Sequence, residues 1–184
     1  MFGRLWSRTR AEAQIAHRLY GAIVTRAREP AFYRDFGVPD SVDGRFDLLV
    51  LHLFLAGEAL ANLGEQGAAV SQEMVDLFFR DMDRSLREMG AGDMGVPRRI
   101  KLMAQSFFGR AEAFRAGAKA GDGDALAAAI ARNVFPDDDG VPAGAVALAD
   151  YALAALAAGQ RAESLFAGVI AFPDPAEFAP AAAS

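Results

Sequence analysis

The strongest constraint on this fold is a stripe of large apolar side chains between residues 71 and 90. Five of them recur at intervals of three and four residues: Val75, Phe78, Met82, Leu86 and Met89. This spacing places all five on one face of an α-helix. Ser71 is a suitable N-cap residue, and Gly90 suits the left-handed position that ends a helix. The pattern therefore predicts an amphipathic helix with one face against a core.

The rest of the chain also has the pattern of helices. Comparable spacing predicts helices at about 11–28, 46–63, 97–118, 124–133, 142–158 and, for a turn or two, 161–170. The segment 46–63 is apolar on most faces, which is typical of a buried central helix. Alanine, the best helix former, accounts for 40 of the 184 residues, whereas Ile, Val and Thr together number only 18. We predict an all-α fold.

The length and the absence of an evident linker predict one compact domain of about six to eight helices. We expect this helical domain at residues 11–172. A flexible basic N-terminus is expected at 1–10, and a loose C-terminal tail at 173–184, apart from a pocket for Phe172. The first ten residues place Phe2, Leu5 and Trp6 among arginines, so a weak interfacial membrane anchor is the alternative reading of that segment.

Motifs for catalysis and for metal binding are missing from the sequence. There is no cysteine and no G-x-S-x-G elbow, and the two histidines, His17 and His52, fall on different helices without a Glu-x-x-His pattern. We expect both histidines to be partly buried and hydrogen-bonded. The spelling G-x-G-x-x-G at 90–95 follows a helix instead of a strand, so it predicts an interhelical turn before Pro97. We expect no enzyme activity, no cofactor and no metal.

Charge alternates along the chain in four blocks. Residues 1–34 and 98–119 each carry a net charge of +5, whereas 35–97 and 120–184 carry −8 and −7. The sequence pI of about 5.0 argues against a nucleic-acid-binding domain. No apolar run reaches the 18 residues that a membrane span requires. We expect a cytoplasmic protein, with a peripheral position at the inner membrane left open.

Five blocks of residues, in this order and spacing, carry a resemblance to a known family. The blocks are Phe32–Asp40; Asp43–Asp47 with Leu51–His52; Asp81–Gly90 with Gly92–Asp93; Val96–Lys101 with Phe108–Arg110; and Arg132–Asn133. Together they resemble the ubiquinol-cytochrome c chaperone family, the assembly factors of the cytochrome bc1 complex. The similarity spans about His17–Phe135, so most of the alanine-rich C-terminal third lies outside it.

The resemblance implies an all-helical, non-enzymatic chaperone that receives newly made cytochrome b and aids assembly of the bc1 complex. In mitochondrial members a small partner protein joins the chaperone, and the pair works close to the ribosome. The composition of this chain resembles that of bacterial members. The resemblance supplies no catalytic residue and no cofactor. The alternative function is a membrane-surface or ribosome-associated adaptor that uses the basic helix face of Arg98, Arg99 and Lys101.

A transmembrane client presents apolar helices and positively charged cytoplasmic loops, so holding it requires an apolar groove with a charged rim. The apolar candidates are Phe32, Tyr33, Phe36, Val38 and Pro39, with Phe79 and Phe108 if they lie outside the buried stripes. The basic candidates are Arg45, Arg87, Arg98, Arg99, Lys101 and Arg110. The alternative is structural: Tyr33 and Phe36 would close the core, and Arg45 and Arg87 would form internal salt bridges.

Overall fold

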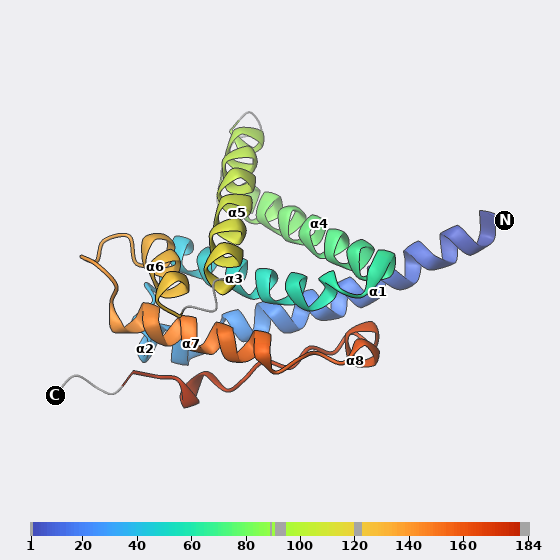
Figure 1. Cartoon of the computed structure of the whole chain (residues 1–184). Helices are drawn as coiled ribbons and strands as arrows, with labels where there is room; N and C mark the ends of the chain where they lie inside the picture. Colours follow the sequence, from blue (N-terminus) through green and yellow to red (C-terminus); the bar gives the residue numbers. More distant parts are fainter. Residues whose placement is uncertain (1, 89, 91–94, 120–122, 181–184) are drawn as a thin grey trace.

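The protein is all-helical throughout the residues that the structure describes. The computed structural model describes residues 2–88, 90, 95–119 and 123–180, with side chains from Arg10 onward. These ranges form eight α-helices and one 3-10 turn, without a strand (Figure 1). The elements are α1 (Phe2–Ala27), α2 (Pro30–Arg34), α3 (Val42–Ala61), α4 (Gly64–Glu88), α5 (Val96–Lys119), α6 (Gly123–Val134), α7 (Ala143–Ala157), α8 (Ala162–Phe166) and η1 (Pro175–Glu177). The predicted all-α fold with six to eight helices is confirmed.

Helix α3 lies at the centre and contacts α1, α4, α5, α6 and α7. The long helix α1 packs along both α3 and α4, while α6 packs between α5 and α7. Figure 1 shows α5 standing steeply above α3, with α4 running away from it at a wide angle.

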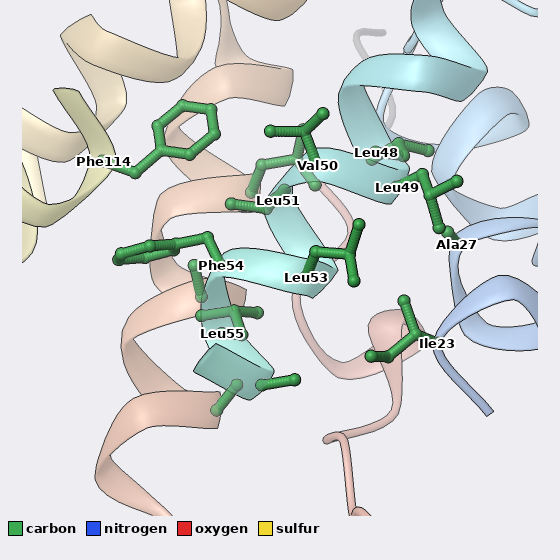
Figure 2. Close-up of a cluster of buried hydrophobic side chains, with 14 of the residues drawn as sticks. Ile23, Ala27, Leu48, Leu49, Val50, Leu51, Leu53, Phe54, Leu55 and Phe114 are labelled. Carbon is green, nitrogen blue, oxygen red and sulfur yellow. The ribbon is translucent and has the colours of Figure 1, made fainter. Parts of the chain in front are cut away.

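The apolar character of α3 on most faces explains its central place. Ser41 caps the helix by accepting a hydrogen bond of 3.1 Å from the backbone N–H of Gly44. Every residue from Leu48 to Ala56 is buried. Figure 2 shows α1 on one side of this segment, through Ile23, and Phe114 of α5 on the other. A helix with partners around it buries all of its faces, at about 1.5–3 kcal/mol for each large aliphatic side chain.

Three helices begin earlier than the sequence predicted, and α3 does so at Val42 instead of Phe46. Helix α4 begins at Gly64, not at Ser71, because the apolar stripe continues backward through Val70 and Gly67. Helix α3 ends at Ala61, and Gly64, with a φ of +66°, lies at the turn into α4, whereas Gly67 lies inside α4. A Cβ at Gly67 would come within 2.3 Å of the Leu60 carbonyl oxygen, so the glycine is needed for close contact between α3 and α4.

Helix α1 begins at Phe2, whereas we expected a helix from Ala11 after a flexible segment 1–10. The turn between α4 and α5 agrees better with the sequence. Gly90 has a φ of +82°, and Pro97 lies in the first turn of α5. Helices precede and follow the G-x-G-x-x-G spelling, as predicted, although residues 91–94 within it lie outside the described residues.

The alanines of α7 serve close helix packing, as expected from their size. Ala145, Ala149 and Ala152 are buried in the core. At the start of the helix, a Cβ on Gly144 would lie 1.9 Å from the Phe36 carbonyl oxygen. Small side chains therefore allow α7 to lie directly against its neighbours.

The segment after residue 172 packs more closely than the loose tail that we expected. Asp174 caps η1 by accepting a hydrogen bond of 2.9 Å from Ala176 N–H, and Pro175 is buried. The Phe178 ring lies 5.9 Å from the Tyr151 ring, centroid to centroid. Residues 173–180 therefore cover part of the core, and 181–184 lie outside the described residues.

Candidate functional site

A groove of about 650 Å³ lies between α4 and α5 and is also lined by residues of α3. Its floor is apolar and includes Leu53, Phe54, Val75 and Phe107. Phe108 forms one edge, and 60% of its surface is exposed, which is unusual for an aromatic residue of this size. We call this feature the α4–α5 groove.

The walls of the α4–α5 groove are made largely of small residues. These are Gly57 and Ala61 of α3, Gly67 and Ala68 of α4, and Ala111 of α5. Ala61 and Ala68 are exposed, and Gly57 and Ala111 are partly exposed, so another helix could approach closely at these four small residues, whereas Gly67 is buried against α3. Gly67 has a second effect here, because its contact with Leu60 holds α4 against α3 at one end of the groove.

Charged side chains form one rim of the groove. Arg115 bonds Glu58 at 2.9 Å and Glu112 at 3.0 Å, and its guanidinium lies 6.0 Å from the centre of the Phe54 ring. Two carboxylates share one guanidinium, so this rim carries a net negative charge. An apolar floor with an acidic rim fits an apolar segment that is flanked by positive charge.

A row of aromatic rings connects the exposed edge of the groove with the core. Phe107 lies 5.2 Å from Phe108 and 5.4 Å from Phe78, and Phe78 lies 5.7 Å from Phe46, centroid to centroid. Phe79 also contacts Phe107, at 5.7 Å, and it is only half-buried. The packing of Phe107 on these rings fixes the backbone that presents Phe108.

A buried ion pair joins α3 to α5 next to this row. Arg110 Nε lies 2.7 Å from Asp47 Oδ1, and the side chains are 20% and 4% exposed. Burial raises the pKa of Asp47 to about 7, and the charge of Asp43 acts in the same direction, whereas Arg110 opposes both. Arg110 also lies over the Phe46 ring, at 5.4 Å from its centroid. Its role in the structure is to connect two helices.

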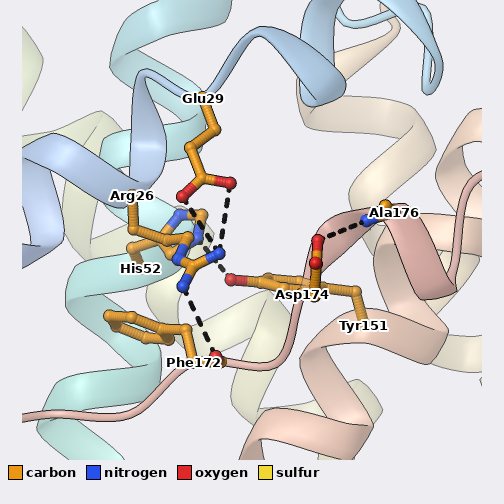
Figure 3. Close-up of polar contacts among 7 residues, drawn as sticks. All are labelled: Arg26, Glu29, His52, Tyr151, Phe172, Asp174 and Ala176. Atoms are coloured by element: carbon orange, nitrogen blue, oxygen red, sulfur yellow. Dashed lines mark hydrogen bonds and ion pairs between the residues drawn. The ribbon is translucent and has the colours of Figure 1, made fainter.

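His52 belongs to a second buried polar contact, shown in Figure 3. Its Nδ1 lies 2.8 Å from the Leu48 carbonyl, which can only accept, so Nδ1 donates and Nε2 accepts from the Tyr151 hydroxyl at 2.9 Å. Burial lowers the pKa of His52 to about 4, so the ring is neutral at pH 7. The Phe172 ring lies 5.1 Å from the ring of His52. Both ring nitrogens are therefore used within the core.

Beside His52, Arg26 and Glu29 form an ion pair of 3.0 Å (Figure 3). The predicted burial and hydrogen bonding hold for His52 but not for His17, which is exposed. Within the part of the chain that the structure describes, no group of three or more His, Cys, Asp or Glu side chains could hold a metal ion. None of the described helices is long and apolar enough to span a membrane.

Comparison with known proteins places this chain in a family. The sequence profile described as ubiquinol-cytochrome C chaperone matches residues 34–172, well over half of the 184 residues. The chain belongs to this family. The crystal structure of the Cbp3 homolog from Brucella abortus is similar to it, with 40% sequence identity and a TM-score of 0.84 over 96% of this chain and 99% of that one. No curated protein matches the chain.

Membership of the ubiquinol-cytochrome c chaperone family confirms the resemblance seen in the sequence, with different bounds. The profile extends to residue 172, whereas we expected the similarity to end at Phe135. It therefore includes α6 and α7, so the alanine-rich helix is part of the family region and not an addition to it. The family is one of chaperones connected with assembly of the bc1 complex.

Three of the expected client-binding residues belong to the core of the chaperone. Phe32, Phe36 and Val38 are 0%, 2% and 2% exposed. Phe32 packs against His52 and Tyr151, with ring centroids 5.4 Å and 5.2 Å away. Their side chains are not available to a client in this conformation, which corrects the groove that we expected there. The periodicity of a five-residue helix is too short to distinguish an exposed from a buried aromatic residue.

The remaining residues of that segment lie at the surface around Tyr33. Its hydroxyl donates a 2.8 Å hydrogen bond to the Ala27 carbonyl, and its ring is half-buried. Pro39 is exposed, and Arg45 forms an ion pair of 2.8 Å with Asp40. The structural alternative therefore describes Phe36 well and describes Tyr33 in part. It does not describe Arg45, because the ion pair of Arg45 with Asp40 lies at the surface and not in the interior.

The basic candidates do not form one site. Arg87 pairs with Asp83 at 2.7 Å along the surface of α4, not in the interior as the structural alternative had it, whereas Arg110 pairs with Asp47 in the interior. Arg98, Arg99 and Lys101 are exposed in the first turns of α5, and the structure gives them no ion pair with any residue it describes. Only Phe108 of the predicted residues lines the α4–α5 groove.

The other residues of the groove were not predicted as a site from the sequence, among them Gly57, Glu58, Ala68, Glu112 and Arg115. A groove forms where two neighbouring helices diverge, and the angle between α4 and α5 is not encoded in the periodicity of either helix. One signal was present, however. Phe107 and Phe108 are adjacent on a helix, where successive side chains point about 100° apart, so on a helix that buries only one face the two rings cannot both point directly at the core.

Proposed function

We propose that this protein is a non-enzymatic assembly chaperone that binds newly made cytochrome b and aids its assembly into the bc1 complex. The observation that carries the proposal is the match to the ubiquinol-cytochrome c chaperone family over residues 34–172. We further propose that the α4–α5 groove holds an apolar segment of the client, because Phe108 is exposed there beside an apolar floor. The side chain of Phe108 would insert between client side chains.

The chemistry of the groove supports a transmembrane segment as the occupant. Such a segment is apolar along about 20 residues, and its cytoplasmic ends carry an excess of Lys and Arg. The apolar floor accepts the side chains of one helix face, and small wall residues such as Gly57 and Ala68 permit close approach. Glu58 and Glu112 at the rim would face the positive ends of the segment.

The test is photo-crosslinking from a benzophenone amino acid at position 108, in cells that express tagged cytochrome b. Position 146 on α7 is the matched control, because Val146 is also apolar and 42% exposed but lies away from the groove. We expect cytochrome b in the crosslinked product from position 108 and not from 146. Equal crosslinking from both positions, or crosslinking from 146 alone, would remove the groove from the proposal.

The chaperone role itself has a separate test. Deletion of the gene should lower the amount of assembled bc1 complex, and the wild-type gene should restore it. Phe108→Ser should restore less complex than Val146→Ser at equal protein level, since only the first change reduces the apolar contact area of the groove. Normal bc1 levels in the deletion strain would contradict the chaperone role, whatever the crosslinks show.

A second candidate is an adaptor at a membrane surface or a ribosome, and the basic start of α5 favours it. Arg98, Arg99 and Lys101 are exposed, and among the described residues they have no ion-pair partner. Exposed cations of this kind bind phosphates in a way that salt weakens. Cosedimentation with anionic vesicles and with ribosomes should fall with salt and after neutralising all three residues to Gln. Cosedimentation of the triple variant equal to that of the wild type would reject this role.

A further inference from the structure

A smaller cleft lies apart from the α4–α5 groove, where α1, α3, α4 and α5 meet. Its volume is about 240 Å³, and most of its lining is apolar. The apolar side chains are Val24, Phe46, Leu49, Met82, Leu86 and Met103. It shares no residue with the α4–α5 groove, so a ligand here would leave the proposed client surface open.

The walls of the cleft combine fixed and adaptable side chains. Phe46 is held by the Phe78 ring at 5.7 Å and by the Arg110 guanidinium at 5.4 Å. Met82 and Met103 are half-buried on α4 and α5, and methionine side chains adjust readily to the shape of an apolar ligand. The cleft thus has the composition of a site for a flexible hydrocarbon chain.

The mouth of the cleft is cationic. Arg28 and Arg45 line the cleft and also line a neighbouring surface depression, which includes Arg34. Arg45 is paired with Asp40 and Arg34 with Asp35, at 2.8 Å and 2.6 Å. Arg28 is exposed and forms no ion pair with the residues that the structure describes. The guanidinium of Arg28 is therefore available at the mouth to pair with one negative charge of a ligand.

We propose that this cleft binds a single-chain carboxylate amphiphile of the fatty-acid class, with its hydrocarbon chain inside and its carboxylate at Arg28. The volume of about 240 Å³ lies just below the range of about 300–1,000 Å³ that is typical of small-molecule sites, so the cleft suits one hydrocarbon chain of medium length better than the two chains of a phospholipid. The proposal goes beyond the chaperone function and does not depend on it.

The test uses sodium decanoate and the protein labelled with ¹³C at the methionine methyl groups. The chain has six methionines, of which Met82 and Met103 line the cleft, while Met74 is buried elsewhere with 1% exposure. Decanoate, added below its micelle concentration, should shift the NMR signals of Met82 and Met103 in a saturable way and leave that of Met74 in place. A shift of all three signals together would indicate detergent action and would overturn the proposal.

Two comparisons isolate the carboxylate. Decanol has the same chain without the charge, and Arg28→Gln removes the guanidinium without changing the apolar wall. We expect decanoate to bind about three to ten times more weakly to Arg28→Gln, the size of effect of a partly exposed ion pair, and decanol to bind both proteins equally. Arg132→Gln, at another exposed arginine for which the structure gives no ion pair, is the control and should bind decanoate as the wild type does.

A third variant tests the place of the chain. Met103→Trp fills the cleft, so it should abolish the shift of Met82 with both compounds. If Met103→Trp does not fold, the Arg28→Gln comparison still tests the proposal. The Arg28 side chain is exposed, so replacing it should not prevent folding. Equal affinity of decanoate for Arg28→Gln and the wild type would overturn the anion site. Shifts with phosphatidylglycerol vesicles but not with decanoate would likewise overturn a free fatty acid as the ligand.

Discussion

Replacing Asp47 by asparagine should change how the stability of the protein depends on pH. The pKa of Asp47 is raised from 3.8 to about 7 in the folded state, mainly by burial. A raised carboxyl pKa means that the folded state binds its proton more tightly than the unfolded state does. The free energy of unfolding gains from this tighter proton binding. The gain is full below pH 3.8 and is lost as the pH rises from 3.8 to about 7.

The size of the effect follows from the shift. At about 1.36 kcal/mol for each pKa unit, a shift from 3.8 to about 7 corresponds to about 4 kcal/mol. His52 acts in the opposite direction. Its pKa falls from 6.5 to about 4, so about 3 kcal/mol of stability is present above pH 6.5 and is lost as the pH falls to 4. In the wild type the two contributions largely cancel between pH 4 and 6.5.

Asparagine cannot titrate, so Asp47→Asn removes the pH-dependent contribution of Asp47 to stability and leaves that of His52. The assay is urea unfolding of the variant and the wild type at several pH values from 4 to 7.5. The stability of the variant minus that of the wild type should rise by about 4 kcal/mol across this range, because all other groups contribute equally to both proteins. The pKa of about 7 already includes the attraction of Arg110 for the ionised carboxylate, so the loss of this ion pair is part of the expected change and adds no separate amount.

The control is Asp150→Asn, at an exposed aspartate for which the structure gives no contact. The same rise with Asp150→Asn would show that the assay responds to the loss of any carboxylate. A flat difference for Asp47→Asn would refute the reasoning, because it would mean that Asp47 ionises in the folded state at its ordinary pKa. The ion pair with Arg110 would then compensate fully for the burial of the carboxyl.

Two further predictions concern packing and a buried hydrogen bond. Gly67→Ala should lower the melting temperature, at a cost of about 1–3 kcal/mol, because the new methyl would lie 2.3 Å from the Leu60 carbonyl oxygen. Gly109→Ala, with open space around the new methyl, should raise it through helix propensity, and an equal effect of both changes would contradict this. Tyr151→Phe should cost about 1–3 kcal/mol in urea unfolding at pH 7, since it leaves Nε2 of His52 buried without a donor, whereas a cost near zero would mean that water replaces the hydroxyl.

The sequence predicted the helices well because each depends mostly on local information. The interval of three and four residues indicated the helices, and Gly90 and Pro97 marked the turn between α4 and α5. The predicted boundary between α3 and α4 was wrong at Gly64 and Gly67. The sequence suggested that both glycines end the helix that begins near Phe46. Only the first adopts a positive φ. The second is required by the distance to Leu60, which no local pattern contains.

The site was harder to predict because exposure depends on what packs from outside. Phe32 and Phe108 are both phenylalanines beside other aromatic residues, yet Phe32 is 0% exposed and Phe108 60%. The difference comes from distant parts of the chain: α7 brings Tyr151 to within 5.2 Å of Phe32, whereas nothing that the structure describes covers Phe108 from outside. The aromatic residue that stays exposed is the one beside the gap between α4 and α5. A large apolar side chain kept there lowers solubility without adding to the core, and this cost is explained if Phe108 is used to bind a client.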